Sequence, residues 1–169
     1  MGKVIHMRYI LCIFSLYIFS YSQNTADINK LKKLFPKSIG EFISDDKGNS
    51  GAVTQAGFSF SFVEMNYKNN RTQKLSLKVM DYTTAKPMFQ AVTQVWNNQF
   101  QINTNEQSIG PYIYKDFKGW KTINHIEKQV QLIISAHGRY LIYLELFNTD
   151  DIDQANQIIK TLNIDVLKV

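Results

Sequence analysis

The chain has 169 residues, of which 44% are hydrophobic, with one cysteine and a formal net charge of +5. This length suits a single ordinary domain, and the apolar fraction excludes a disordered chain. One cysteine excludes both an intramolecular disulfide and a cysteine-rich zinc site.

The first 22 residues have the pattern of a secretory signal peptide. Lys3 and Arg8 give a positive start, and an apolar run covers residues 9–20. The small residues Ser20 and Ser22 occupy the third and the first position before the expected cleavage site. This pattern predicts export and cleavage after Ser22. An uncleaved membrane anchor is the alternative, although the run is shorter than the about 20 residues that cross a bilayer.

Removal of residues 1–22 changes the composition of the part that folds, residues 23–169. Lys3 and Arg8 leave and no acidic residue does, so the net charge falls from +5 to +3. A charge this small gives no indication of a nucleic-acid partner. Cys12 also leaves, and it lies too early in the apolar run to become a lipidated first residue. We expect a single domain without a disulfide or an integral membrane segment.

The N-terminal part of the mature chain predicts a helix followed by a loop. Residues 25–35 place apolar side chains three or four positions apart, and Pro36 ends that pattern. Residues 37–51 contain three glycines among Asp and Asn residues, which is typical of a loop. The D-D-K-G-N-S stretch within it lacks the spacing and the closing Glu of a calcium loop.

A β-hairpin is predicted over residues 52–82. Strict alternation over residues 57–62 places three phenylalanines on one strand face and two serines on the other. A turn is expected at 68–71, where two asparagines occur together, and Leu75, Leu77 and Val79 alternate on the returning strand.

A second helix is expected over residues 85–100, with Pro87 in its first turn. Its apolar stripe contains methionine and aromatic residues. We expect this stripe to pack on the sheet, and the alternative is that it lines a ligand cleft.

The rest of the chain predicts four strands and a last helix. The strands are expected near 112–117, 120–126, 130–136 and 139–147, and His137-Gly138 is typical of a two-residue hairpin turn. Because the last two strands are apolar on both faces, we expect them to be central. Thr149-Asp150-Asp151 is expected to cap the final helix.

This order of elements predicts an α+β fold. The expected architecture is a mainly antiparallel sheet of about six strands with helices on both faces, a three-layer α/β/α sandwich. The order resembles the PsbP-like sandwich. The stretches L-F-P-K-S-I-G-E-F, G-W-K-T, G-R-Y-L-I-Y and I-I-K-T-L-N-I-D resemble small exported bacterial proteins without an assigned activity. The resemblance implies a periplasmic or extracellular place in a Gram-negative envelope and a non-enzymatic role.

Few residues suggest chemistry. His125 and Glu127 lie two apart and could share a strand face, but a third metal ligand is missing. His137 fits a turn position. Asp81 and Glu64 are possible partners across the first hairpin. No nucleophilic elbow, phosphate loop or dinucleotide motif occurs, so the sequence predicts no catalytic, cofactor-binding or metal-binding residues and no cofactor.

Aromatic side chains are the least ordinary feature of the strand regions. Tyrosine and tryptophan suit binding surfaces, although strands favour aromatics in any protein. The residues concerned are Tyr67, Tyr82, Tyr112, Tyr114, Trp120, Tyr140 and Tyr143.

Three functions remain open from the sequence. The first hypothesis is an exported, non-catalytic envelope protein that binds another protein or assists an assembly. An alternative is a carrier of a small apolar ligand or lipid, held in an apolar cleft between the sheet and residues 85–100. A second alternative is an enzyme of unknown class.

Overall fold

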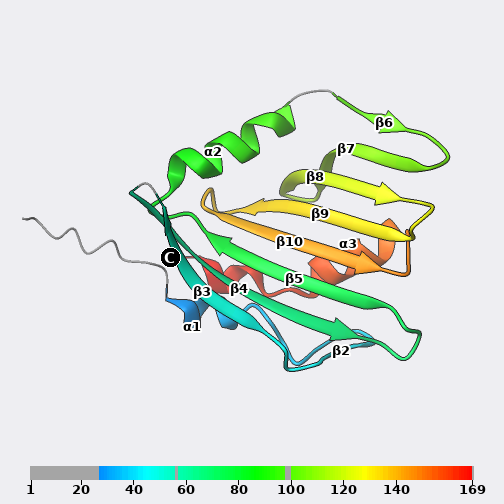
Figure 1. Ribbon diagram of the computed structural model, residues 1–169, viewed down its shortest axis with the longest axis horizontal. Helices are drawn as coiled ribbons and strands as arrows, with labels where there is room; N and C mark the ends of the chain where they lie inside the picture. Colours follow the sequence, from blue (N-terminus) through cyan, green and yellow to red (C-terminus); the bar gives the residue numbers. More distant parts are fainter. Residues whose placement is uncertain (1–26, 56, 98–99, 169) are drawn as a thin grey trace, which may run out of the picture.

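The computed structural model describes residues 27–55, 57–97 and 100–168 of the chain (Figure 1). The expected signal peptide and the start of the first expected helix lie outside the described residues. Within the described residues, no helix has both the length and the apolar character needed to cross a membrane.

Within the described part of the chain, ten antiparallel strands form one sheet. Their order is β1-β2-β4-β5-β10-β9-β8-β7-β6, and β3 pairs with β4 beside this path. The strands are β1 (Ser38–Ile39), β2 (Phe42–Ser44), β3 (Asn49–Gln55), β4 (Phe58–Lys68), β5 (Lys74–Asp81), β6 (Ile102–Asn103), β7 (Gln107–Tyr114), β8 (Phe117–Asn124), β9 (Gln129–Ala136) and β10 (Tyr140–Phe147).

The helices are few and short. They are α1 (Ile28–Lys32), α2 (Lys86–Gln94), α3 (Ile152–Thr161) and the 3-10 turns η1 (Val95–Asn97) and η2 (Ile164–Leu167). Strands make up 46% of the described residues and helices 22%. The expected six-stranded, three-layer α/β/α sandwich is therefore wrong, and so is the PsbP-like architecture that the resemblance implied.

Three of the four extra strands arise from the segment expected to be a loop, and the fourth is the two-residue β6. Residues 37–51 contain β1, β2 and the first part of β3, despite their glycines and asparagines. These residues form strands because β4 is long enough for two strands to pair with different parts of the same edge. β3 pairs with Phe58–Glu64 and β2 pairs with Tyr67 and Lys68. Tertiary pairing thus overrides local loop preference.

The main core lies on one face of the sheet. Alternate residues of the central strands face this side, among them Leu77 of β5, Leu132 of β9 and Leu144 of β10. Helix α3 packs over them through Ala155, Ile158 and Ile159, and Leu31 of α1 joins the same cluster. α3 runs behind the central strands in Figure 1. The expected central position of the last two strands is confirmed, because β10 lies between β5 and β9.

The opposite face is covered only in part. Phe89 of α2 packs with Tyr82 and Leu141 in a second, smaller cluster, and Tyr82 stacks on Phe60 with ring centroids 5.5 Å apart. The expectation that the stripe of this helix packs on the sheet is confirmed for Phe89 and for its partly buried neighbours Val92 and Trp96.

The hairpin between β4 and β5 is confirmed, with continuous antiparallel pairing from Ser61–Asp81 to Lys68–Lys74. The burial of its two faces, however, is the reverse of what hydrophobicity alone would suggest. Ser59 and Ser61 are buried, whereas the three phenylalanines beside them are only half-buried. Alternation along the sequence shows only that the two serines share one face of β4. Val63 and Tyr67 lie on that same face and belong to the main core, so the serines face the main core.

The turn between β9 and β10 is also confirmed. His137 and Gly138 both have positive φ, at 50° and 66°. Positive φ at both central residues is the requirement of the two-residue turns that match the twist of a hairpin.

Gly119 of β8 tests how closely the sheet is packed. A Cβ atom at this position would overlap the carbonyl oxygen of Ile133 on β9. We expect Gly119→Ala to lower the free energy of unfolding by about 2 kcal/mol or more, measured by urea denaturation.

The matched control is Gly51→Ala, where the new methyl would meet the Phe62 ring at an ordinary 3.4 Å. That change is expected to be neutral or to stabilise by about 0.5 kcal/mol, since alanine loses less backbone entropy. Equal effects of the two changes would contradict this account.

Candidate functional site

A cleft lies between η1 and the strands beneath it. After α2, the chain passes over β7 and β8, and the space between them forms a cavity of about 320 Å³. Its lining combines apolar, hydroxyl and amide groups with one charged side chain, that of Lys118. The lining residues are Thr93, Trp96, Asn97, Pro111, Tyr112, Ile113, Lys118, Gly119 and Ser135.

Apolar side chains around this cleft extend into solvent. The exposed fractions are 51% for Val95, 57% for Phe100 and 73% for Ile113. The backbone of Phe100 lies beside β7, because its carbonyl oxygen is within 3.5 Å of the Cβ position of Gly110. We name Val95, Trp96, Phe100, Pro111 and Ile113 the η1 patch.

The η1 patch exists because the helix ends early. The sequence predicted one helix over residues 85–100, which would have turned its whole stripe onto the sheet. Instead α2 ends at Gln94 and η1 ends at Asn97. Phe89 stays buried, whereas Val95 and Phe100, which belonged to the same expected stripe, are exposed.

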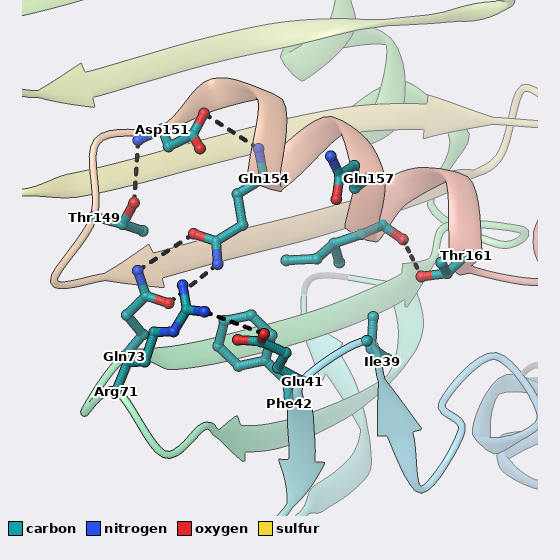
Figure 2. Close-up of a pocket in the computed structure, with 12 residues that line it drawn as sticks. Ile39, Glu41, Phe42, Arg71, Gln73, Thr149, Asp151, Gln154, Gln157 and Thr161 are labelled. Carbon is teal, nitrogen blue, oxygen red and sulfur yellow. Dashed lines mark hydrogen bonds and ion pairs between the residues drawn. The ribbon is translucent and has the colours of Figure 1, made fainter.

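A second hollow, of about 390 Å³, lies beside α3 (Figure 2). Gln73 and Gln154 face each other across it, and the Gln154 amide nitrogen donates to Gln73 Oε1 at 3.1 Å. Arg71 pairs with Glu41 at 3.4 Å on its rim. Most of the polar groups drawn there thus bond to one another. These contacts connect the β4–β5 turn, the β1–β2 turn and α3, which gives the hollow a structural role.

The start of α3 satisfies its own backbone donors. The Asp151 carboxylate accepts hydrogen bonds from the backbone nitrogens of Asp153 and Gln154, at 2.8 and 3.4 Å. The expected cap of the final helix is confirmed.

His125 forms a hydrogen bond with Asp150 rather than lying beside Glu127 as the sequence suggested. It follows β8 in a turn, and its Nδ1 atom lies 2.9 Å from Asp150 Oδ2, which also accepts from Lys128 at 3.1 Å. These two hydrogen bonds lower the pKa of Asp150. Glu127 instead accepts from Asn124. The possible ligand pair of His125 and Glu127 is therefore not brought together.

His137 lies apart from His125, in the β9–β10 turn, with Nε2 3.3 Å from the carbonyl oxygen of Ile164. Within the described residues, no three His, Cys, Asp or Glu side chains gather as a metal site would require.

The carboxylates of the first hairpin lie on opposite faces of the sheet. Glu64 pairs with Lys78 at 2.8 Å on the partly covered face. Asp81 is buried and accepts from Arg139 at 2.6 Å and from the backbone nitrogen of Thr83 at 2.9 Å. Asp81 and Glu64 are therefore not partners across the first hairpin. The place of Asp81 in the alternation of Leu77 and Val79 is the sequence signal that identifies a buried position.

Most of the strand tyrosines belong to the protein interior. Tyr67, Tyr82, Tyr112 and Tyr140 are buried. The Tyr112 hydroxyl donates to Asn156 of α3 at 2.6 Å, and burial together with neighbouring Tyr114 raises the pKa of Tyr112 to about 12. These four tyrosines are therefore not available as an exposed binding surface; Tyr67, Tyr112 and Tyr140 lie in strands, and Tyr82 follows β5.

Comparison of the chain with protein-family models, curated proteins and solved structures gives no match. The resemblance to exported bacterial proteins stays a prediction, and function is inferred from the chain's own residues.

The ion pair at Asp150 predicts a pH-dependent contribution to stability. Because the folded pKa of Asp150 is lowered, its contribution is complete above the ordinary Asp value and is lost as the pH falls below that value, through the lowered folded pKa. We expect Asp150→Asn to destabilise by at most about 1 kcal/mol above about pH 5, and by less at lower pH.

Urea denaturation across that pH range is the measurement. Asp116→Asn is the control, since Asp116 forms no ion pair within the described residues. A difference between wild type and Asp150→Asn that grows towards acid pH would contradict the structural role.

Proposed function

We propose that the chain is an exported, non-catalytic binding protein that holds a protein partner on the η1 patch. The observation that carries the proposal is that Val95, Phe100 and Ile113 are each more than half exposed. Ile113 lines the cleft, Val95 precedes the cleft residue Trp96, and the Phe100 backbone lies beside Gly110 of β7. Burying apolar area is worth about 25 cal/mol per Å², so an isolated domain loses stability by leaving such side chains in water. Grouped apolar exposure is typical of an interaction site.

The shape of the patch favours a protein partner. Ile113 lines the cleft and is 73% exposed, whereas the exposed Val95 and Phe100 do not line it. A small molecule inside the cleft would leave Val95 and Phe100 in water, whereas a protein laid across η1 and β7 would cover all three. Aromatic residues such as Trp96 and Phe100 are enriched at interfaces, where a few anchors contribute most of the affinity.

The contacts of the histidines support a non-catalytic role. A base in nucleophilic catalysis faces a hydroxyl or thiol on one side and an orienting group on the other. His125 faces Asp150, and within the described residues its ring forms no hydrogen bond to a Ser, Thr or Tyr hydroxyl. Export is supported by the pattern of residues 1–22, which is typical of a secretory signal peptide.

A photoreactive residue placed at Ile113 tests this proposal in the native envelope. We expect it to form one discrete covalent adduct with a partner protein on irradiation. The control position is Ile126, which is 69% exposed but lies in the β8–β9 turn at the other end of β8. Phe100→Ser in the Ile113 probe should reduce the adduct at least about tenfold, as the loss of an interface anchor does. Equal adducts at both positions, or none at Ile113, would refute the proposal.

A second candidate function is carriage of a small apolar ligand. It is favoured by the cleft itself, whose about 320 Å³ fall at the lower end of the range for ligand sites. Trp96 and Pro111 supply apolar wall, and Lys118 supplies one positive charge for an acidic head group.

Native mass spectrometry of chain purified from its own host tests the carrier function. A carrier would show a bound small molecule that is lost in Trp96→Ala and retained in Ile126→Ala. A mass equal to that of the polypeptide alone would count against the carrier and would leave the protein-binding proposal standing.

A further inference from the structure

Strand β3 has a long free edge. It pairs with β4 on one side, and within the described residues no strand pairs with its other side. The edge strands β1 and β6 have two residues each, whereas β3 has seven. Sheets protect their edges by short strands, charges, prolines or covering segments, because free backbone groups attract other strands.

None of the protective residue types occurs in β3. Its sequence is N-S-G-A-V-T-Q, without a charge or a proline. Asn49, Ser50, Ala52, Val53 and Thr54 are all exposed, so the described residues leave the strand uncovered. Outside the β3–β4 ladder, no backbone hydrogen bond to β3 occurs among the described residues. The strand is therefore available to a further strand.

The sequence of β3 is symmetric in chemical character about its middle residue. Ala52 is the centre, Gly51 and Val53 flank it, Ser50 and Thr54 carry hydroxyls, and both end residues are amides in the sequence. When a strand pairs antiparallel with its own copy, residues equally far from the centre become partners. In such a pair, hydroxyl would meet hydroxyl, and no like charges would face each other.

We propose that β3 pairs antiparallel with β3 of a second copy of this chain, around a two-fold axis at Ala52. This interface is isologous, so it closes as a dimer rather than growing into a fibre. It joins the two sheets edge to edge and supplies hydrogen-bond partners to the free backbone groups of both strands.

Side-chain sizes fit this register. Val53 of one copy comes opposite Gly51 of the other, on the sheet face that carries Phe60 and Phe62. The Phe62 ring already lies 3.4 Å from the Cβ position of Gly51. Val53 of the second copy would therefore pack beside that ring, and a β-branched residue against an aromatic is a favourable cross-strand pair.

A second copy fits better than an unrelated strand. A charged strand finds no opposite charge along Asn49–Gln55, whereas the strand's own copy matches it residue by residue. Beyond the strand, the same register places Lys47 opposite Gly57 of the second copy, which avoids a pair of like charges. The η1 patch lies towards β7, near the far edge of the sheet from β3, so this proposal and the proposed function stand or fall separately.

Charge at Ala52 tests the dimer. Analytical ultracentrifugation of the mature chain is expected to show a concentration-dependent dimer. Ala52→Lys places two lysines directly across the axis and should raise the dissociation constant about fivefold or more, an effect that added salt should reduce. Ala52→Asp should do the same. An equal mixture of the two variants should form a heterodimer at least as tight as the wild-type dimer.

Ser38→Lys is the matched control, because it puts the same charge on the exposed edge strand β1. It should leave the dissociation constant unchanged. Thermal unfolding of each variant confirms that the monomer is folded. A wild-type chain that stays monomeric at its solubility limit would overturn the proposal. So would Ala52→Lys dimers as tight as the wild type, or a mixture that fails to restore dimerisation.

Discussion

The register of the central strands is the constraint on which the rest of this structure depends. Pairing of β10 with β5 and β9 sets Leu144 beside Leu77 and Leu132, so that one face of three neighbouring strands is continuously apolar. A slip of one residue in any of them would turn its apolar set to the other face. The register also brings Tyr140 opposite Asp81, whose buried carboxylate meets Arg139 at the end of the same sheet.

Unequal cover of the two faces follows from this register and explains the candidate site. The face that carries the main core is closed by α1, α3 and η2. Among the described residues, the other face is covered by the short helix α2 and by η1, and the apolar cluster there is small. Where α2 gives way to η1, the remaining apolar side chains have no layer to pack into. The η1 patch is thus the place where the fold itself lacks a partner surface.

The edges of the sheet also differ from one another, in the length of the strand that each one exposes. Two-residue strands end the sheet at β1 and β6, which leaves little backbone for another chain to pair with. β3 departs from this pattern, since β4 is long enough to hold it beside β2. The seven-residue β3, whose outer edge the described residues leave unpaired, and the η1 patch lie on different parts of the sheet. They are the two interfaces that we propose, one for a second copy of the chain and the other for a different protein.

Local patterns in the sequence were enough to identify the elements whose signals are short-range. Alternation identified β4 and β5, the His137-Gly138 pair identified the turn before β10, and a carboxylate at the start of α3 identified its cap. The stripe of α2 was also visible, and it pointed to the region of the η1 patch. These features depend on residues a few positions apart, which a single sequence displays directly.

Tertiary structure alone decided the number of strands, the faces and the two interfaces. Glycines and asparagines in residues 37–51 favour a loop locally, yet the long edge of β4 turns them into strands, because ladder hydrogen bonds outweigh weak local preference. Burial of Ser61 and Asp81 depends on which face α3 covers. The exposure of Ile113 and the free edge at Ala52 depend on what the rest of the chain leaves uncovered, which no local pattern contains.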